Sequence, residues 1–349
     1  MRTARVLTIA AAVTGITFAG QAAGRRPSGD AQICGRQGPV QLFCGPSRSE
    51  DLVAIPRTSW IVASAIGGGI HLIDAHKRTS VQLYPSPAAT DRLDRTRYPT
   101  CQAAPDDAEK ASYSTIGLSI RPGARGVHTL YAIRYPTISR VHVFELDLRK
   151  RQPSITWIGC VEAPDTIFLN SLVPLGDGGF LATHFYERGP DPAAARARAA
   201  AGEITGWLLG WHPRTGWTKV AGSDTSGPNG VELSPDGKWV YVSEWGRSIV
   251  YRMRLGGDAA SRDSIRLDFR PDNVHWAPDG RLLVGGATDT DSRVVKIDPL
   301  TFNVTELVRL PDDSARFFHA SVAAQVENEL WLGSARANRI AIYPLAPAR

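Results

Sequence analysis

The chain has few cysteines and lacks the cysteine spacings typical of zinc sites. Only four cysteines occur among 349 residues, and none lies in a Cys-x-x-Cys or Cys/His arrangement, so zinc is not indicated. Their even number favours disulfides if the chain leaves the cytosol. Three pairings are possible, and we favour Cys34 with Cys44 and Cys101 with Cys160.

The sequence also lacks clustered basic residues. The formal net charge is +6, but the excess is mainly arginine that is spread along the chain. No basic stretch is interleaved with aromatic residues, as a nucleic-acid groove would require. We therefore expect a small-molecule partner and no nucleic acid.

A run long enough to cross a membrane is missing as well. Arg2 and Arg5 precede the apolar run 6–19, which is short for a span, and small residues follow it. This pattern is typical of a secretory signal peptide over residues 1–23, cleaved near Ala22. We expect a secreted or periplasmic mature protein without a stable membrane span, with an uncleaved N-terminal anchor as the alternative.

What the chain does contain is a repeat with a drifting period. Six similar segments recur 44 to 66 residues apart, at residues 50, 116, 170, 229, 273 and 319. In the unit 229–254, three strand-like runs follow one another, and the first two are joined by the tight turn 234–237. These features predict an all-β fold, a six-bladed β-propeller over residues 47–349 with 24–46 as an N-terminal extension.

Ring closure and the loops at the channel mouth follow from this fold. The sequence predicts that residues 60–65 pair with the last strands, near 329–333 and 339–343, because closing the ring removes exposed sheet edges. Loops over the channel are expected to determine substrate specificity, in particular residues 86–112 and 186–203.

One segment breaks the rhythm of strands. Asp191 and Pro192 precede an alanine-rich run that ends at Gly202. An N-cap residue, proline at the first helical position and a terminal glycine predict one short helix inserted in the third unit. The helix is a candidate lid over the channel, and a surface decoration is the alternative.

Oxygen-bearing side chains occur at four of the six repeat points. Equivalent positions on the innermost strands converge on the axis of a propeller. Carboxylate and amide oxygens suit Ca²⁺, which takes 6–8 oxygen ligands and acts as a Lewis acid on a lactone or ester carbonyl. The predicted metal ligands are Glu50, Asn170, Asn229, Asp272 and Asn273.

Two observations limit this interpretation. Asparagine is a common turn residue, so each asparagine could cap the approach to a strand, although recurrence in three consecutive units favours ligands. Asp272 and Asn273 are neighbours, and neighbours on a regular strand point to opposite faces. Both side chains reach one ion only if the backbone forms a turn there.

The same segments resemble the serum paraoxonase/arylesterase group. The resemblance rests on residues 49–52, 169–170, 229–238, 272–273 and 280–285, and it covers roughly residues 47–345. More broadly, the chain is similar to calcium-dependent propellers that include gluconolactonases and strictosidine synthase-like proteins. The resemblance implies a catalytic calcium, held by the five predicted ligands, and hydrolysis of lactones or aryl esters.

The chain departs from that family at its proposed histidine dyad. Ile116 and Tyr135 stand where paraoxonases place the two histidines, and Ser171 replaces an aspartate near a second, structural calcium. A lone histidine is more often structural than catalytic. The remaining candidates for a general base are Glu50, Asp272, His184 and His319.

Three functions stay open at this point. A secreted calcium-dependent hydrolase of lactones or esters is the leading prediction. A propeller that binds a small ligand or a protein without catalysis is the first alternative, and the missing histidines favour it. A strictosidine synthase-like enzyme is the second, and the intact ligand set argues against it because that activity needs no calcium cage.

Overall fold

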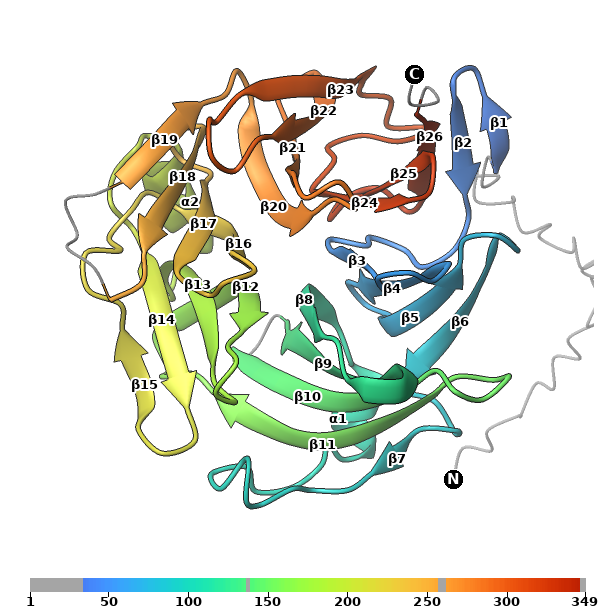
Figure 1. Ribbon diagram of the computed structural model, residues 1–349, viewed down its shortest axis with the longest axis vertical. Coiled ribbons are helices and arrows are strands. Elements are labelled where there is room, and N and C mark those ends of the chain that lie inside the picture. Colours follow the sequence, from blue (N-terminus) through green and yellow to red (C-terminus); the bar gives the residue numbers. More distant parts are fainter. Residues whose placement is uncertain (1–33, 136–138, 257–261, 346–349) are drawn as a thin grey trace, which may run out of the picture. The chain divides into compact units, whose positions relative to one another are not determined.

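A computed structural model describes residues 34–135, 139–256 and 262–345, in which six sheets surround a central axis (Figure 1). In each of the first five sheets, four antiparallel strands follow one another in sequence order, and the second sheet has a short fifth strand that is parallel to its neighbour. The sixth sheet combines strands from both ends of the described chain. The predicted six-bladed β-propeller is confirmed. The predicted signal peptide lies outside the described residues.

The strands of the first three blades follow the chain. Blade 1 contains β3 (Leu52–Ala54), β4 (Trp60–Ala65), β5 (Gly69–Asp74) and β6 (Thr79–Tyr84). Blade 2 contains β8 (Thr115–Arg121), β9 (Val127–Arg134), β10 (Arg140–Asp147) and β11 (Ser154–Glu162), with the short β7 (Thr90–Asp91) parallel to β11. Blade 3 contains β12 (Ile167–Pro174), β13 (Phe180–Glu187), β14 (Trp207–His212) and β15 (Gly216–Lys219).

The other three blades complete the ring. Blade 4 contains β16 (Pro228–Leu233), β17 (Trp239–Glu244), β18 (Ile249–Arg254) and β19 (Arg262–Arg266). Blade 5 contains β20 (Arg270–Trp276), β21 (Leu282–Ala287), β22 (Asp291–Ile297) and β23 (Val304–Pro311). Blade 6 contains β24 (Val322–Val326), β25 (Glu329–Gly333) and β26 (Ile340–Pro344), followed outward by β2 (Val40–Phe43) and β1 (Gly35–Gln37).

The predicted ring closure was wrong. Strand β4 pairs with β3 and β5, so both of its edges are occupied within blade 1. The ring is closed instead by β2, which pairs with the outer edge of β26 through Leu42 opposite Ala341. Residues 35–43, which belong to the segment expected to precede the propeller, therefore supply two strands of blade 6.

A β-bulge interrupts the innermost strand of four blades at the same place. In each case the regular pairing skips two residues, which lie before Leu118, Leu172, Val231 and Val274. The bulged pairs are Ile116-Gly117, Asn170-Ser171, Asn229-Gly230 and Asp272-Asn273. A bulge changes the direction in which side chains leave the strand. By this register Asp272, rather than Asn273, corresponds to Asn229, which corrects the repeat point assigned to the fifth unit.

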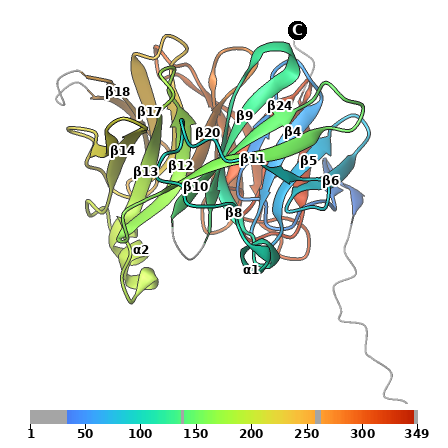
Figure 2. The same ribbon diagram turned by 90° about the horizontal axis from the view of Figure 1, so that it is seen from below.

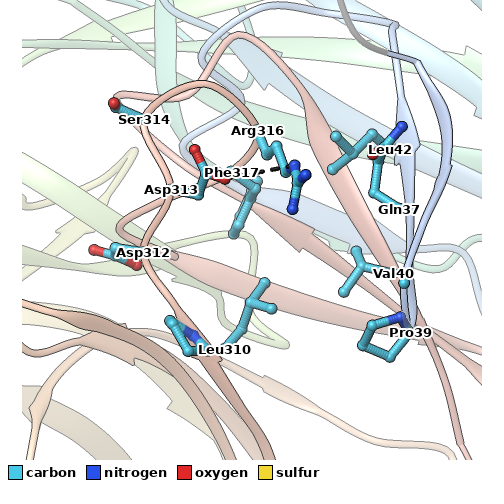
Figure 3. Close-up of a pocket in the computed structure, with 12 residues that line it drawn as sticks. Gln37, Pro39, Val40, Leu42, Leu310, Asp312, Asp313, Ser314, Arg316 and Phe317 are labelled. Atoms are coloured by element: carbon cyan, nitrogen blue, oxygen red, sulfur yellow. Dashed lines mark ion pairs between the residues drawn. The ribbon is translucent and has the colours of Figure 1, made fainter.

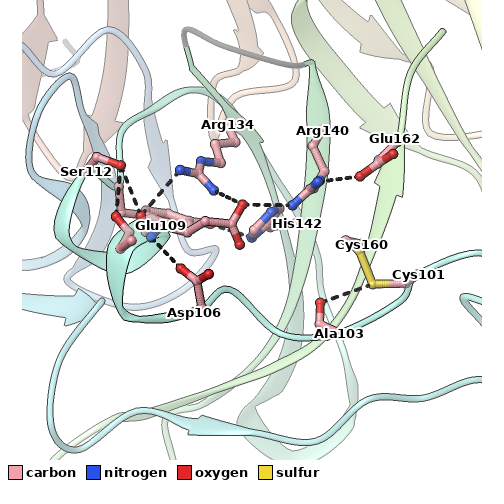
Figure 4. A network of polar contacts seen from close by, with 12 residues as sticks. Cys101, Ala103, Asp106, Glu109, Ser112, Arg134, Arg140, His142, Cys160 and Glu162 are labelled. Carbon is pink, nitrogen blue, oxygen red and sulfur yellow. Dashed lines mark hydrogen bonds and ion pairs between the residues drawn. A yellow bond between two sulfur atoms is a disulfide. The ribbon is translucent and has the colours of Figure 1, made fainter. Parts of the chain in front are cut away.

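The long connection between β6 and β8 is attached to blade 2 (Figure 4). The disulfide Cys101–Cys160 links it to β11. Glu109, on the short helix α1 (Asp107–Ala111), accepts hydrogen bonds from Arg134 Nη1 at 2.8 Å and Arg140 Nη1 at 3.2 Å. The connection is thus held in place by covalent and ionic contacts.

Both predicted disulfide pairings, Cys34–Cys44 and Cys101–Cys160, are confirmed. The Cys34–Cys44 bridge joins the residues that flank the β1–β2 hairpin, which closes the ring. Two disulfides suit an oxidising compartment. Within the described ranges, no helix is long and apolar enough to cross a bilayer.

The predicted helix is also confirmed, as α2 (Pro192–Ala200) between β13 and β14. The Asp191 carboxylate caps it by accepting the Ala194 N–H at 2.9 Å. Ala199 is fully buried beside Phe185 and Trp245, and a side chain at Gly246 would clash with the Ala199 carbonyl. The helix is therefore packed against blades 3 and 4 rather than loosely attached. Figure 2 shows α1 and α2 at the same end of the propeller.

Candidate functional site

Five buried carboxylate and amide oxygens lie at the bulges or at the equivalent place in blade 1. They are Glu50 Oε2, Asn170 Oδ1, Asn229 Oδ1, Asp272 Oδ1 and Asn273 Oδ1. None of them has a hydrogen-bond partner in the described residues, where only Gln325 Oε1 is another carboxylate or amide oxygen in that state. A buried acceptor without a partner costs about 1–3 kcal/mol. These oxygens belong to the five residues that the sequence predicts as metal ligands.

Contacts between different blades bring the bulges together. Asn273 Nδ2 donates to Glu50 Oε1 at 3.0 Å, which links blade 5 to the start of blade 1. Thr183 Oγ1 of blade 3 donates to the Asn229 carbonyl of blade 4 at 2.6 Å. A Cβ at Gly230 would lie 2.7 Å from the Asp272 carbonyl, so glycine allows the two bulges to touch. We call Glu50, Asn170, Asn229, Asp272 and Asn273 the axial oxygen cluster.

The bulge in β20 removes the geometric objection to Asp272 and Asn273. Regular pairing stops at Pro271 and resumes at Val274, so the two residues between them do not alternate as on a flat strand. The Oδ1 atoms of both side chains are buried and unpartnered. The turn that the sequence analysis required is therefore supplied by a bulge.

Burial disfavours the charged form of both carboxylates of the cluster. Burial raises the pKa of Glu50 well above its usual value, and the negative charges of Asp272 and Asp51 act in the same direction. Burial likewise raises the pKa of Asp272 to about 7, although Arg196 opposes this effect. A divalent cation among these oxygens would lower both pKa values and compensate the unpartnered acceptors.

The composition of the cluster fits calcium better than zinc. Two carboxylates and three amides offer only oxygen, the ligand that Ca²⁺ takes in flexible geometry with 6–8 positions. Zinc prefers histidine and thiolate ligands, and within the described ranges no group of three or more His, Cys, Asp or Glu side chains could hold a metal. Metal binding by the five residues stays a prediction that this donor set supports.

The two candidate histidines lie in different surroundings. His319 lines a cavity of about 440 Å³ together with Asp272. Burial lowers its pKa to about 4, and the Arg336 and Arg196 charges act the same way, so the ring is neutral at pH 7. His319 also has a φ of 56°, in the left-handed region, which is costly for a residue with a side chain. The structure thus brings His319 to the cavity beside the cluster.

His184 has a structural environment instead. It is fully buried on β13, with its ring edge-on to Trp207 at 4.5 Å between centroids. Its Nδ1 accepts the Phe168 N–H at 3.2 Å, so the neutral ring carries its proton on Nε2, which is buried and unpartnered. In the described part of the chain, no hydrogen bond or ion pair joins it to the axial oxygen cluster. This arrangement favours packing over proton transfer.

The two positions at which the resemblance to paraoxonases would place histidines are apolar or aromatic. Ile116 is buried on the β8 bulge, at the place equivalent to Asn170. Tyr135 packs edge-on to Phe168, with 6.2 Å between ring centroids. Neither residue supplies a base, so proton transfer by such a dyad has no counterpart here.

A buried ion pair, which the sequence analysis missed, stands next to the cluster. Asp51 is fully buried and accepts hydrogen bonds from the backbone of Leu52 and Leu118 and from His275 Nε2 at 2.7 Å. Burial opposes the charge of His275, but Asp51 and Glu232 raise its pKa to about 10. The cationic His275 imidazole therefore already forms an ion pair with Asp51. This ion pair disfavours a divalent cation at Asp51 in addition to the one predicted at the cluster. The available signal in the sequence was that His275 follows Asn273 by two residues.

Three arginines were also missed. Arg196 on α2, Arg270 at the start of β20 and Arg336 after β25 line the cavity that contains Asp272 and His319. They are separated by at least 66 residues in sequence and belong to no motif, so only the fold brings them together.

Another cavity, of about 590 Å³, lies between the β1–β2 hairpin and residues 310–317 (Figure 3). None of the predicted site residues lines it.

The buried His184 predicts a loss of stability in acid. Its pKa is lower in the folded chain than the unfolded value of about 6.5, so protons bind the unfolded state preferentially below that pH. We expect the free energy of unfolding to fall by up to about 1.4 kcal/mol per pH unit from this group as the pH decreases from about 6.5 to 4. In His184→Gln, which retains an acceptor for the Phe168 N–H, this part of the acid dependence should disappear.

Urea unfolding at pH 6.5 and 4.5 measures this effect. The wild type should lose roughly 2 kcal/mol more than His184→Gln over the interval. His212→Gln is the matched control, because His212 lies on β14 of the same blade and forms no ion pair in the described residues. Parallel profiles for the wild type and His184→Gln would contradict the assignment of a buried neutral His184.

Known proteins resemble this chain in structure but not in sequence. No protein-family model and no curated protein sequence matches it. The structure of a luciferin-regenerating enzyme is similar, with a TM-score of 0.54 and 12% identity over 88% of this chain and 94% of that one. A virginiamycin B lyase from Staphylococcus aureus has a TM-score of 0.50 and 11% identity, over 87% and 96% of the two chains.

A third similar structure is that of Raptor from Chaetomium thermophilum. Its TM-score is 0.51 at 9% identity, over 89% of this chain and 29% of that one. At such identities a likeness concerns the path of the backbone and not the chemistry of the site. These similarities therefore place the chain among β-propellers, as its six blades require.

Proposed function

We propose that this protein is a calcium-dependent hydrolase of lactones or aryl and carboxylic esters. The observation that carries the proposal is the axial oxygen cluster, in which five buried oxygens lack hydrogen-bond partners. Four of these residues, Glu50, Asn170, Asn229 and Asp272, occupy the same register position, on bulges or at the equivalent place in blade 1. Residues that only formed turns would have no need to recur at one register position. Two similar propellers are named as enzymes, a luciferin-regenerating enzyme and a virginiamycin B lyase, so the fold is compatible with catalysis.

Each member of the cluster has a defined part in this proposal. Glu50 and Asp272 supply the two negative charges, and Asn170, Asn229 and Asn273 supply neutral amide oxygens. A bound calcium would polarise the substrate carbonyl and stabilise the oxyanion that develops when water attacks. Five protein oxygens leave coordination positions for water and substrate, because Ca²⁺ takes 6–8 ligands.

His319 is the candidate that orients the attacking water. It lines the same cavity as Asp272, and its low pKa keeps the imidazole neutral and able to accept a hydrogen bond. A group with a pKa near 4 is a weak base at pH 7. We therefore assign it to orienting water, and Glu50 or Asp272 remains the candidate for accepting the proton.

The same proposal includes export. The two disulfides suit an oxidising compartment, and residues 1–23 have the composition of a signal peptide. The mature protein would then act outside the cytosol, where free calcium is abundant enough to occupy a site of moderate affinity.

A propeller that binds calcium and a ligand without catalysis is the second candidate. Ile116 and Tyr135, at the places of the family's histidines, favour it. A synthase-like activity that needs no calcium is disfavoured, because it gives no reason for five unpartnered oxygens on the axis.

Hydrolysis of a panel of aliphatic lactones, phenyl acetate and 4-nitrophenyl esters by the purified mature protein tests the proposal. We expect turnover with calcium and loss of at least roughly 100-fold in kcat/KM after treatment with a chelator, with recovery when calcium is restored. Calcium bound at one site per chain without turnover of any substrate would favour the binding propeller. Turnover that is unaffected by the chelator would refute the calcium mechanism.

A further inference from the structure

We propose that the cavity beside Asp272 binds a carboxylate group of the substrate, so that the preferred lactones or esters carry a negative charge. This inference deepens the proposed function and rests on it for the scissile bond. We call Arg196, Arg270 and Arg336 the arginine rim, because all three line this cavity of about 440 Å³.

The arginine rim is assembled from three parts of the fold. Arg196 comes from α2, the helix packed on blades 3 and 4, whereas Arg270 opens blade 5 and Arg336 follows β25 in blade 6. Scattered surface arginines would not share one cavity with a member of the axial oxygen cluster. The helix predicted as a candidate lid thus contributes a charged group to the wall of the site.

Trp245 holds two of the guanidinium groups in place. The Arg270 guanidinium lies 4.3 Å and the Arg196 guanidinium 4.5 Å from the centroid of the Trp245 ring, which is almost fully buried. Cation–π contacts orient a guanidinium while leaving its N–H groups available. Arg270 Nη2 contacts the Ala200 carbonyl at 3.4 Å, and Arg270 Nη1 is buried without a partner. A donor is therefore preorganised and unsatisfied.

The carboxylates of the cavity oppose the positive charge of the rim only in part. Asp268 forms ion pairs with Arg293 at 2.9 Å and with Arg309 at 3.5 Å, which lie outside the cavity lining. Asp272 belongs to the axial oxygen cluster. Asp289 is exposed and, like Arg196 and Arg336, forms no ion pair in the described part of the chain. The cavity thus keeps uncommitted positive charge next to the proposed reaction centre.

A carboxylate is the anion that fits these observations best. Guanidinium groups bind carboxylates through two parallel hydrogen bonds. A single charge on the ligand suits a rim whose three cations are partly opposed by Asp289, whereas a doubly charged phosphate would meet more repulsion. The volume is within the range of small-molecule sites, so a compact substrate fits. Carboxylate binding at the rim would place the carbonyl of the same molecule near Asp272.

Titration calorimetry on the calcium-loaded protein, with the monocarboxylate butyrate as the probe, tests binding without relying on turnover. We expect Arg336→Gln and Arg270→Gln to weaken butyrate binding roughly tenfold to a hundredfold, because each removes charge-assisted hydrogen bonds. Arg336 is exposed, so its variant is not expected to disturb folding. Arg254→Gln is the matched control, since Arg254 ends β18 of blade 4 and does not line the cavity.

Turnover of a matched substrate pair completes the test. The pair is 5-oxotetrahydrofuran-2-carboxylate and its methyl ester, with opening of the lactone ring monitored in both. In the wild type we expect a higher kcat/KM for the charged lactone than for its methyl ester. In Arg336→Gln the ratio of these two kcat/KM values should fall toward one. Equal kcat/KM values in the wild type, or butyrate binding unchanged in both arginine variants, would overturn the arginine rim and leave the proposed hydrolase standing. Butyrate binding that depends on the rim, in a protein that opens neither lactone and hydrolyses no ester of the panel, would refute the hydrolase and retain the carboxylate site.

Discussion

Asp272→Asn should lose tightly bound calcium and, with it, hydrolytic activity. Removing one of two carboxylate charges from the axial oxygen cluster is expected to lower calcium affinity by at least roughly 100-fold, since calcium affinity depends strongly on ligand charge and a lost outer-shell contact alone costs up to that much. The substitution keeps the size of the side chain and an oxygen at the same position. The loss would therefore report charge rather than packing.

Calcium content of the dialysed protein, measured by elemental analysis, and the change in melting temperature on adding calcium are the readouts. Ligand at 100 times its Kd stabilises a folded protein by about 2.7 kcal/mol, so the wild type should melt at a higher temperature with calcium and Asp272→Asn should respond far less. Ile116→Val is the matched control, because Ile116 occupies the equivalent bulge in blade 2 and offers no oxygen. One calcium per chain retained by Asp272→Asn would remove this residue from the proposed site.

Deleting residues 34–43 should cause the largest loss of stability. The deletion removes β1 and β2 and leaves the outer edge of β26 unpaired. It also removes the buried side chains of Val40, Leu42 and Phe43, the last of which packs edge-on to Trp331 at 5.5 Å. Burial of three such side chains contributes about 5 kcal/mol, and an exposed strand edge promotes aggregation. We expect a lower denaturant midpoint and a tendency to associate.

A matched pair of valine substitutions separates closure from general strand effects. Val40 on β2 is 4% exposed and Val81 on β6 is 48% exposed, so Val40→Ala should lower the free energy of unfolding by roughly 1–3 kcal/mol and Val81→Ala by much less. Chemical denaturation followed by tryptophan fluorescence measures both. A deletion protein with the wild-type midpoint would show that β2 does not close the ring.

Most of the axial oxygen cluster could be predicted from the sequence, because each of its residues lies near the start of a recurring strand. The phase of the fifth unit could not. Asn273 aligns with Asn229 by residue type, whereas in the backbone register the residue equivalent to Asn229 is Asp272. The identity of a side chain does not reveal where a bulge begins, because a bulge is defined by its pairing with the neighbouring strand.

Ring closure was mispredicted for a related reason. A hydrophobic strand pattern such as 60–65 shows that a segment belongs to a sheet, but not which edge of which strand it meets. Both edges of β4 are taken by β3 and β5, so β4 could not pair with β26. The outer edge of β26 pairs with β2 instead. The buried pair of Asp51 and His275, and the arginine rim, depend on contacts of the same kind between distant parts of the chain.

By itself, the sequence determined the blades, the capped helix α2 and the recurrence of side-chain oxygens, and it favoured the two disulfide pairings among three. The blades and the helix follow from alternation, turn residues and capping within a few residues of one another, where local backbone preferences dominate. Only the tertiary structure decided which strand closes the ring, how Asp272 and Asn273 both face the axis, and which arginines meet beside them. Those outcomes depend on pairing and packing between residues far apart in the chain, and no local pattern records them.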